Sequence, residues 1–155
     1  VAEINGVEYI NDSKATNVEA LDKALLAARP GPRGEPNVWL IAGGRDKGLD
    51  FHAVAPTLSK RVKGAFLIGE ASEKIRSAWS LFTPCMASGS LLEAVAEAAR
   101  KAVSGDVVLL SPACSSFDQF RNYQHRGEVF CEAVKSIGSG QNVRCPNISD
   151  SPTAQ

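Results

Sequence analysis

Short apolar runs alternate along this chain with stretches whose apolar residues recur every three or four positions. Continuous runs occupy Val38–Ala42, Ala65–Ile68 and Val107–Leu110, and such runs are typical of parallel strands that are covered on both faces. A weaker alternation predicts a short strand at Val7–Asn11, and a fifth, weak strand is expected near Pro84–Ala87. These runs are the candidate strands of one sheet.

Helical periodicity fills the intervals between these strands. Thr16 and Glu19 have the spacing of a capping box, which predicts a helix that begins at Thr16. The remaining expected helices are about Phe51–Val62, Ala71–Trp79, one after Ser90 with a stripe of Leu92, Val95, Ala99 and Ala102, and one after Ser116 with a buried face of Phe120, Tyr123, Gly127, Phe130, Val134 and Ile137. Alternating strands and helices favour an α/β fold, a single Rossmann-like open sheet that is mostly parallel, with helices on both faces.

Three polar loops follow predicted strands, and open α/β sheets bind ligands at the carboxyl ends of their strands. They are NDSKATN at Asn11–Asn17 (the first loop), GGRDKG at Gly43–Gly48 (the glycine-rich loop) and SPACSSFDQF at Ser111–Phe120 (the third loop). Asn, Asp, Ser and Thr are also common in turns and caps. For Asp12 and Lys14, which capping does not require, ligand binding and a plain turn both stay open.

The other two loops are ambiguous when taken alone. Lys47 can offer a positive charge to a carboxylate or phosphate, but the glycine-rich loop alone is interpreted as a turn with solvated charges. Ser115 and Ser116 precede a predicted helix, where a hydroxyl caps the helix by default or binds an anion. The sequence has neither of the nucleotide-binding motifs Walker A and GxGxxG. It also lacks the GxSxG elbow, so no catalytic nucleophile is assigned.

Composition excludes several classes of partner. The 155 residues carry 17 basic and 17 acidic side chains, which gives no electrostatic reason to expect nucleic acid or an acidic membrane. No signal peptide or membrane-length apolar run is evident. The four cysteines form no CxxC pair, so we expect no metal site, a structural Cys114 and reduced thiols in a cytoplasmic protein. We also expect a monomer.

The three loop sequences together resemble signatures of the Mur ligase family, in the same order and at similar separations. The resemblance extends through RNYQHRGEVF at Arg121–Phe130 and covers about Ile4–Ile137. The first loop is similar to that of the members that add D-glutamate. The resemblance implies the carboxy-terminal domain of a three-domain ligase that uses ATP and Mg2+ to join D-glutamate to UDP-N-acetylmuramoyl-L-alanine through an acyl phosphate, in peptidoglycan synthesis.

The resemblance also implies roles for the first two loops. Asp12 would accept hydrogen bonds from the ATP ribose. Lys14, Thr16 and Lys47 would hold the incoming amino acid near its α-carboxylate. Thr16 would then serve both as helix cap and as ligand contact, which a hydroxyl allows because it has one proton and two lone pairs.

The third loop would bind the other end of the amino acid. Ser116 and the backbone at Phe117 would bind the side-chain carboxylate, and Tyr123 would close the pocket. Residue 123 is often Phe in the family, so Tyr123 is a departure that adds a hydroxyl.

These implications give an expected domain organisation. Residues 1–137 would form the amino-acid-binding domain and residues 138–155 a polar, flexible tail. The sugar-binding and ATP-binding domains would be absent from this chain, which starts as though cut after the interdomain hinge, and the isolated chain is predicted to be inactive. The alternatives are a related Mur or folylpolyglutamate ligase domain, and a stand-alone α/β module that binds a small anion or nucleotide.

Overall fold

A six-stranded sheet runs through the protein, whose computed structural model describes residues 2–46 and 48–138. The strands are β1 (Ala2–Ile4), β2 (Val7–Asn11), β3 (Val38–Gly43), β4 (Val62–Ile68), β5 (Cys85–Ala87) and β6 (Val107–Leu110). Their order across the sheet is β1-β2-β6-β3-β4-β5. The pair β1–β2 is antiparallel, and every other neighbouring pair is parallel. The predicted open, mostly parallel sheet is therefore confirmed.

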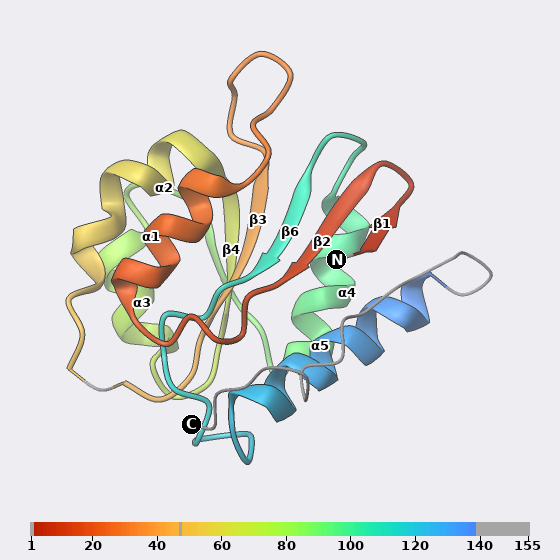
Figure 1. Ribbon diagram of the computed structural model, residues 1–155. Helices are drawn as coiled ribbons and strands as arrows, with labels where there is room; N and C mark the ends of the chain where they lie inside the picture. Colours follow the sequence, from red (N-terminus) through yellow and green to blue (C-terminus); the bar gives the residue numbers. More distant parts are fainter. Residues whose placement is uncertain (1, 47, 139–155) are drawn as a thin grey trace.

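Helices cover both faces of this sheet (Figure 1). They are α1 (Val18–Ala27), the 3-10 helix η1 (Phe51–Val54), α2 (Ala55–Arg61), α3 (Ser72–Trp79), α4 (Leu91–Lys101) and α5 (Tyr123–Ile137). The helices α1, α2 and α3 lie on one face, and α4 and α5 lie on the other. Of the predicted tail, only Gly138 is among the described residues, where it forms the C-cap of α5.

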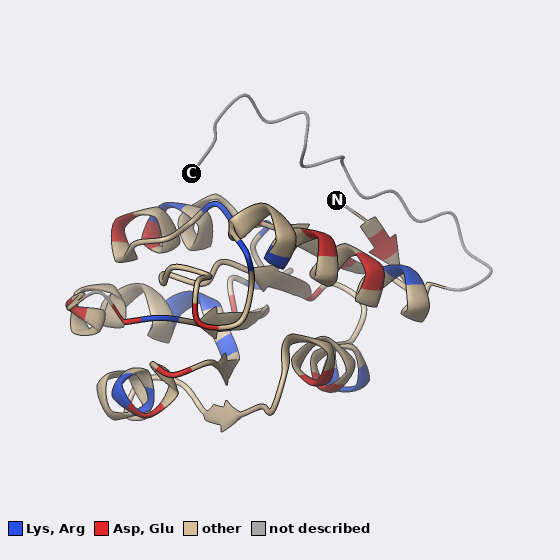
Figure 2. Ribbon diagram, turned by 90° about the horizontal axis from the view of Figure 1, so that it is seen from below, with Lys and Arg blue, Asp and Glu red and all other residues tan. Residues whose placement is uncertain are grey.

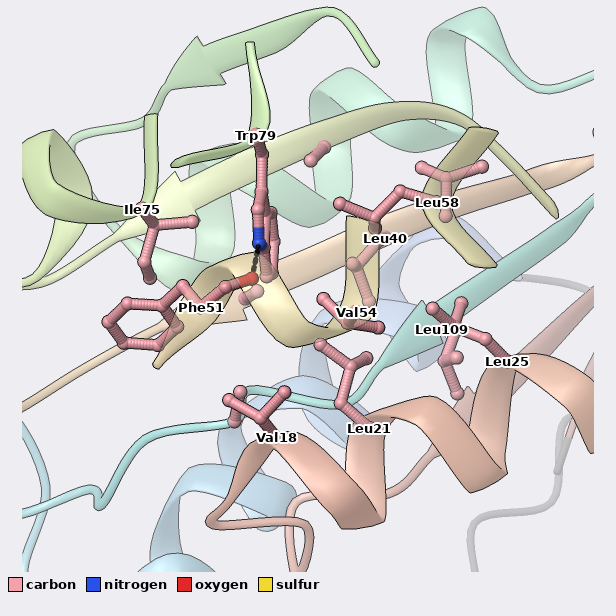
Figure 3. Close-up of a cluster of buried hydrophobic side chains, with 14 of the residues drawn as sticks. Val18, Leu21, Leu25, Leu40, Phe51, Val54, Leu58, Ile75, Trp79 and Leu109 are labelled. Atoms are coloured by element: carbon pink, nitrogen blue, oxygen red, sulfur yellow. Dashed lines mark hydrogen bonds between the residues drawn. The ribbon is translucent and has the colours of Figure 1, made fainter. Parts of the chain in front are cut away.

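Two apolar cores hold the layers together. On the α1–α3 side, Leu21 and Leu25 pack with Leu40 and Leu109 of the sheet and with the other side chains of Figure 3. Trp79 is buried there and its Nε1 donates to the Phe51 carbonyl at 2.7 Å. A second core lies between the opposite face of the sheet and α4 and α5. Because both faces are covered, the central strands β3 and β6 and most of β4 are apolar, which is why their sequences form continuous runs.

The buried face of α4 differs from the predicted stripe. Val95 is buried as expected, but Leu92 is 56% exposed and the helix buries Leu91, Ala94 and Ala98 instead. The helix is capped by Ser90, whose Oγ accepts from the Glu93 amide at 3.1 Å. The predicted start of the helix after Ser90 is confirmed. The predicted buried face is wrong by one residue, because Leu91 and Leu92 are equally apolar and the pattern does not distinguish them.

Two other boundaries differ from the prediction. The helix expected over Phe51–Val62 divides into η1 and α2, and Val62 already belongs to β4 because it pairs with Val38. The strand β1 was not predicted. It joins β2 through Asn5 and Gly6, whose φ angles of 53° and 79° are the left-handed values that a two-residue hairpin turn requires.

A buried carboxylate lies near the amino-terminal starts of β3, β4 and β6, at the end of the sheet opposite to the three loops. The Asp106 side chain is 5% exposed and accepts from Lys63 Nζ at 2.9 and 3.1 Å. It also accepts from Trp39 Nε1 at 3.0 Å and from the Val103 amide at 3.0 Å. One side chain thus joins three strands at this end.

We expect Asp106→Ala to lower the free energy of unfolding by about 3 kcal/mol, because the remaining Lys63 charge and the indole N–H lose a buried partner. Urea denaturation followed by circular dichroism measures this. Glu132→Gln is the matched control, since Glu132 forms an exposed pair with Lys135 at 3.6 Å and such pairs contribute under about 1 kcal/mol. Equal losses in the two variants would contradict the assigned role of Asp106.

Candidate functional site

The three loops lie together at the carboxyl end of the parallel strands, at the lower end of the sheet in Figure 1. The first loop is joined by backbone hydrogen bonds to the last residue of β6 and to the third loop. The Asp12 amide donates to the Leu110 carbonyl at 2.8 Å, and the Ala113 amide donates to the Ala15 carbonyl at 2.9 Å. This proximity follows from the parallel pairing of β2 with β6.

The glycine-rich loop is joined to the third loop in the same way. The Gly43 amide donates to the Pro112 carbonyl and the Arg45 amide to the Ser115 carbonyl, each at 3.0 Å. A Cβ on Gly44 would lie 2.3 Å from the Ser115 carbonyl oxygen. Glycine is therefore required at position 44, because any side chain would separate the two loops.

Asp12 is held in place from the third loop. Ser111 Oγ donates to Asp12 Oδ2 at 2.9 Å. Burial raises the pKa of the Asp12 carboxyl, and the Ser111 hydrogen bond and the Lys14 charge oppose that rise. One carboxylate oxygen thus has a fixed partner, and the group keeps further acceptor capacity for a ligand.

A groove of about 560 Å³ runs from Asp12 and Lys14 along α1. Its floor is mostly alanine and leucine or isoleucine side chains of α1, β2 and β6, with Lys23 at its edge. Lys14 is exposed. The groove therefore combines an apolar floor with a carboxylate and two ammonium groups at its rim.

The capping role predicted for Thr16 is wrong. Asn17 is the N-cap of α1, and its side chain accepts from the Ala20 amide at 2.8 Å. The hydrogen bond from Ala113 to the Ala15 carbonyl holds the preceding residues to the third loop, and Asn is at least as good a cap as Thr. Thr16, which is half-buried, keeps only its predicted ligand role.

Arg126, which sequence reasoning missed, is fully buried on α5 between the first and third loops. Its Nε donates to Ser13 Oγ at 2.9 Å, its Nη2 to the Ser13 carbonyl at 2.7 Å and its Nη1 to the Cys114 carbonyl at 3.0 Å. Burial lowers the pKa of the guanidinium to about 10, while Cys114 and Asp118 act in the opposite direction. The group is therefore still charged at neutral pH.

The predicted contacts of the third loop have different exposures. Ser116 is fully buried and its Oγ has no hydrogen-bond partner among the described residues, whereas Phe117 is 54% exposed. Neither Ser115 nor Ser116 caps α5, because Asn122 is its N-cap and accepts from the His125 amide at 2.8 Å. Tyr123 is buried, and its carbonyl accepts from Ser13 Oγ at 2.7 Å.

The glycine-rich loop is also attached to α3. Asp46 Oδ2 accepts from Lys74 Nζ at 2.9 Å, and Asp46 Oδ1 accepts from the Gly48 amide at 2.8 Å. These bonds lower the pKa of the Asp46 carboxyl, the Lys74 hydrogen bond most strongly. Lys47, a predicted ligand of the amino acid, lies outside the described residues.

One sequence signal could have identified a further site residue, Arg126. Arg126 follows Tyr123 by one helical turn and precedes Phe130 by another, so it interrupts an apolar stripe with a charge. Asp118 follows Ser116 and accepts from the Glu70 amide at 3.1 Å, which attaches the start of α3 to the third loop. Both residues are polar groups that hold loops together.

Charge and metal ligands are not concentrated here. Figure 2, which views the chain from the end where the loops lie, shows acidic and basic segments mixed along the helices. Across residues 2–46 and 48–138, no group of three or more His, Cys, Asp or Glu is arranged to hold a metal ion. Within the same residues, no helix has the length and apolar character needed to cross a membrane.

Comparison with known proteins gives consistent matches. Residues 1–114 match the protein family described as "Mur ligase, glutamate ligase domain". The UDP-N-acetylmuramoylalanine–D-glutamate ligase of Acidobacterium capsulatum is 50% identical over 134 residues, which is 86% of this chain and 28% of that protein. The enzyme of the same name from Solibacter usitatus is 45% identical over 137 residues, or 88% of this chain and 30% of that protein.

Solved structures share the fold at low sequence identity. The murein peptide ligase Mpl of Psychrobacter arcticus 273-4 gives a TM-score of 0.59 at 13% identity, with 86% of this chain and 28% of that chain covered. The MurF ligase of Thermotoga maritima in complex with ADP gives a TM-score of 0.54 at 17% identity, with 86% of this chain and 29% of that chain covered. These similarities support the Rossmann-like α/β fold.

We expect the Asp46 carboxyl to titrate below the ordinary value of about 3.9 for Asp, because its charged form accepts two hydrogen bonds. The hydrogen bond between Asp46 of the glycine-rich loop and Lys74 of α3 is therefore intact at pH values above the ordinary pKa of Asp. It is lost as the pH falls through the lowered pKa of Asp46. NMR titration of side-chain carboxyl carbons measures the shift. Lys74→Met should return the Asp46 pKa toward the ordinary value, and an unchanged pKa would contradict the role of Lys74.

Proposed function

This chain belongs to the Mur ligase family as its glutamate ligase domain, and from that premise we propose that it binds the incoming amino acid in an ATP-dependent ligase that joins D-glutamate to UDP-N-acetylmuramoyl-L-alanine. The names of relatives that are 43–50% identical to this chain support D-glutamate as the substrate. The chain spans less than a third of the length of those relatives. The reaction therefore belongs to a longer protein, of which this domain is one part.

The observation that carries the proposal is the assembly of all three loops at one end of the sheet. D-glutamate is a dicarboxylate, so its site needs two separated groups that donate hydrogen bonds or carry positive charge. We assign its α-carboxylate to Lys14, Thr16 and Lys47, on the first and glycine-rich loops. We assign its side-chain carboxylate to Ser116 and the backbone at Phe117, with Tyr123 as a wall of the pocket.

The buried hydroxyl of Ser116 supports this assignment. A buried polar group without a partner costs about 1–3 kcal/mol, and a carboxylate would accept a hydrogen bond from Ser116 Oγ. Because Ser116 is not exposed, the assignment requires that part of the structure around it moves when the ligand binds. Such loop closure over a substrate is common in enzymes.

ATP is assigned to the neighbouring groove. Asp12 would accept hydrogen bonds from the ribose hydroxyls through the oxygen that Ser111 does not use, and the apolar floor of the groove continues from that point. ATP would transfer its terminal phosphoryl group to the carboxylate of the acceptor, and Mg2+ would neutralise charge on the phosphates. The phosphate and Mg2+ sites are assigned to the rest of the protein, since this sequence has no Walker A loop.

The contribution of this domain to the reaction would be orientation. The amine nitrogen of D-glutamate would attack the acyl carbon, the new C–N bond would form as phosphate leaves, and the amine would lose a proton. The loops would hold both carboxylates so that the amine faces the acyl phosphate. Such orientation can accelerate a reaction by several orders of magnitude, and it needs no nucleophile from the protein.

The test of this proposal uses the full-length protein that contains this chain, incubated with ATP, Mg2+ and UDP-N-acetylmuramoyl-L-alanine. We expect phosphate release and a product heavier by one glutamate residue with D-glutamate, and at least about tenfold less of both with L-glutamate. Turnover with another amino acid but not with D-glutamate would contradict the substrate. The isolated 155-residue chain is a control that should give no product.

We expect Lys14→Met to raise the KM for D-glutamate about tenfold or more, because a charged hydrogen bond to a carboxylate contributes about 1.5–3 kcal/mol. Steady-state kinetics with varied D-glutamate measures the effect. Lys60→Met, an exposed lysine of α2, is the matched control and should leave the KM unchanged. An unchanged KM in Lys14→Met would remove Lys14 from the site.

A further inference from the structure

A charged side chain that is fully buried needs an explanation, because the desolvation of a guanidinium costs several kcal/mol. Arg126 is 0% exposed, and its three hydrogen bonds reach residues 113 and 12 positions away in the sequence. We call Arg126 with its acceptors on Ser13 and Cys114 the Arg126 bridge. The bridge connects the first loop to the third loop across the carboxyl end of the sheet.

We propose that Arg126 is a positioning residue that fixes the separation between the first loop and the third loop, and thereby sets the affinity of the site for its amino acid. This inference rests on the function proposed above. It concerns a residue that lies behind the site and contacts the loops rather than the ligand.

The acceptors of Arg126 are the immediate neighbours of proposed ligand residues. The Ser13 carbonyl, which accepts from Nη2 at 2.7 Å, belongs to the peptide bond that leads to Lys14. The Cys114 carbonyl, which accepts from Nη1 at 3.0 Å, lies two residues before Ser116. A shift of either carbonyl therefore shifts the residue that we assign to one carboxylate of the ligand.

Two further contacts extend the bridge. Ser13 Oγ accepts from Arg126 Nε and donates to the Tyr123 carbonyl at 2.7 Å, which couples the first loop to the start of α5. A Cβ on Gly44 would lie 3.4 Å from Arg126 Nη1, so the glycine-rich loop also passes beside the guanidinium. A lysine cannot replace this arrangement, because one ammonium lacks the planar fork of donors.

Asp12 does not depend on the bridge. Its carboxylate is held by Ser111 Oγ at 2.9 Å and its amide by the Leu110 carbonyl at 2.8 Å. Loss of Arg126 should thus disturb the amino-acid end of the site and spare the ATP ribose contact. A residue that only stabilised the fold would not produce this difference between the two substrates.

The experiment compares Arg126→Met and Arg126→Lys with the unmodified full-length ligase. We expect Arg126→Met to raise the KM for D-glutamate at least about tenfold, since misplacement of a binding group by about 1 Å has effects of this size or larger, and to change the KM for ATP less than about twofold. Arg126→Lys keeps one or two of the hydrogen bonds and should give an intermediate KM for D-glutamate.

The control for a general loss of stability is Lys63→Met. Lys63 is half-buried and donates to Asp106 at 2.9 and 3.1 Å at the other end of the sheet, so its loss should lower Tm without changing either KM. An unchanged KM for D-glutamate in Arg126→Met, or equal increases for D-glutamate and ATP, would overturn the proposal.

A milder variant covers the case in which Arg126→Met does not fold. Ser13→Ala removes one acceptor of the bridge and its bond to Tyr123, and it should raise the KM for D-glutamate alone. Unchanged KM values, or equal increases for D-glutamate and ATP, would overturn the role of the bridge.

If the unmodified enzyme fails to use D-glutamate, the proposed function fails before any variant is measured. If it uses D-glutamate and the variants show no selective effect, only the inference about Arg126 fails.

Discussion

The first and third loops meet at the carboxyl ends of β2 and β6, where Ser13 and Cys114 are buried. Buried backbone carbonyls need donors, and Arg126 supplies three donors to the first and third loops from a single side chain. Backbone bonds from Gly43 and Arg45 then attach the glycine-rich loop. The geometry of the candidate site depends on this arrangement.

The rest of the fold provides a stiff support for these loops. Both faces of the sheet are covered by helices, and two apolar cores fix the strands from either side. Asp106 ties the strand starts together at the opposite end, through Lys63, Trp39 and Val103. Polar contacts thus connect neighbouring segments at the two ends of the sheet, while apolar packing supplies most of the stability.

Local patterns in the sequence were enough to predict the layered sheet, because a strand covered on both faces leaves an uninterrupted apolar run such as Val107–Leu110. Local patterns gave the wrong residue where two neighbouring residues could each fill the same structural position. The N-cap of α1 is Asn17 rather than Thr16, and the preceding Ala15 is held by a hydrogen bond from the third loop. The hairpin at Asn5 and Gly6 does carry a local signal, the Asn-Gly dipeptide. For the site, loop composition and family resemblance gave the candidate ligand residues. A charge within an apolar stripe marks Arg126 in the sequence, but its partners Ser13 and Cys114 lie 113 and 12 positions away and follow from no local pattern.

The central claim is that a dicarboxylic amino acid lies between the first and third loops. The most direct measurement is a crystal structure of the full-length ligase with D-glutamate and a non-hydrolysable ATP analogue. The account predicts one carboxylate of D-glutamate within hydrogen-bond distance of Lys14 Nζ, and the other within that distance of Ser116 Oγ, with Arg126 still bonded to Ser13 and Cys114. D-glutamate bound away from both loops would contradict it.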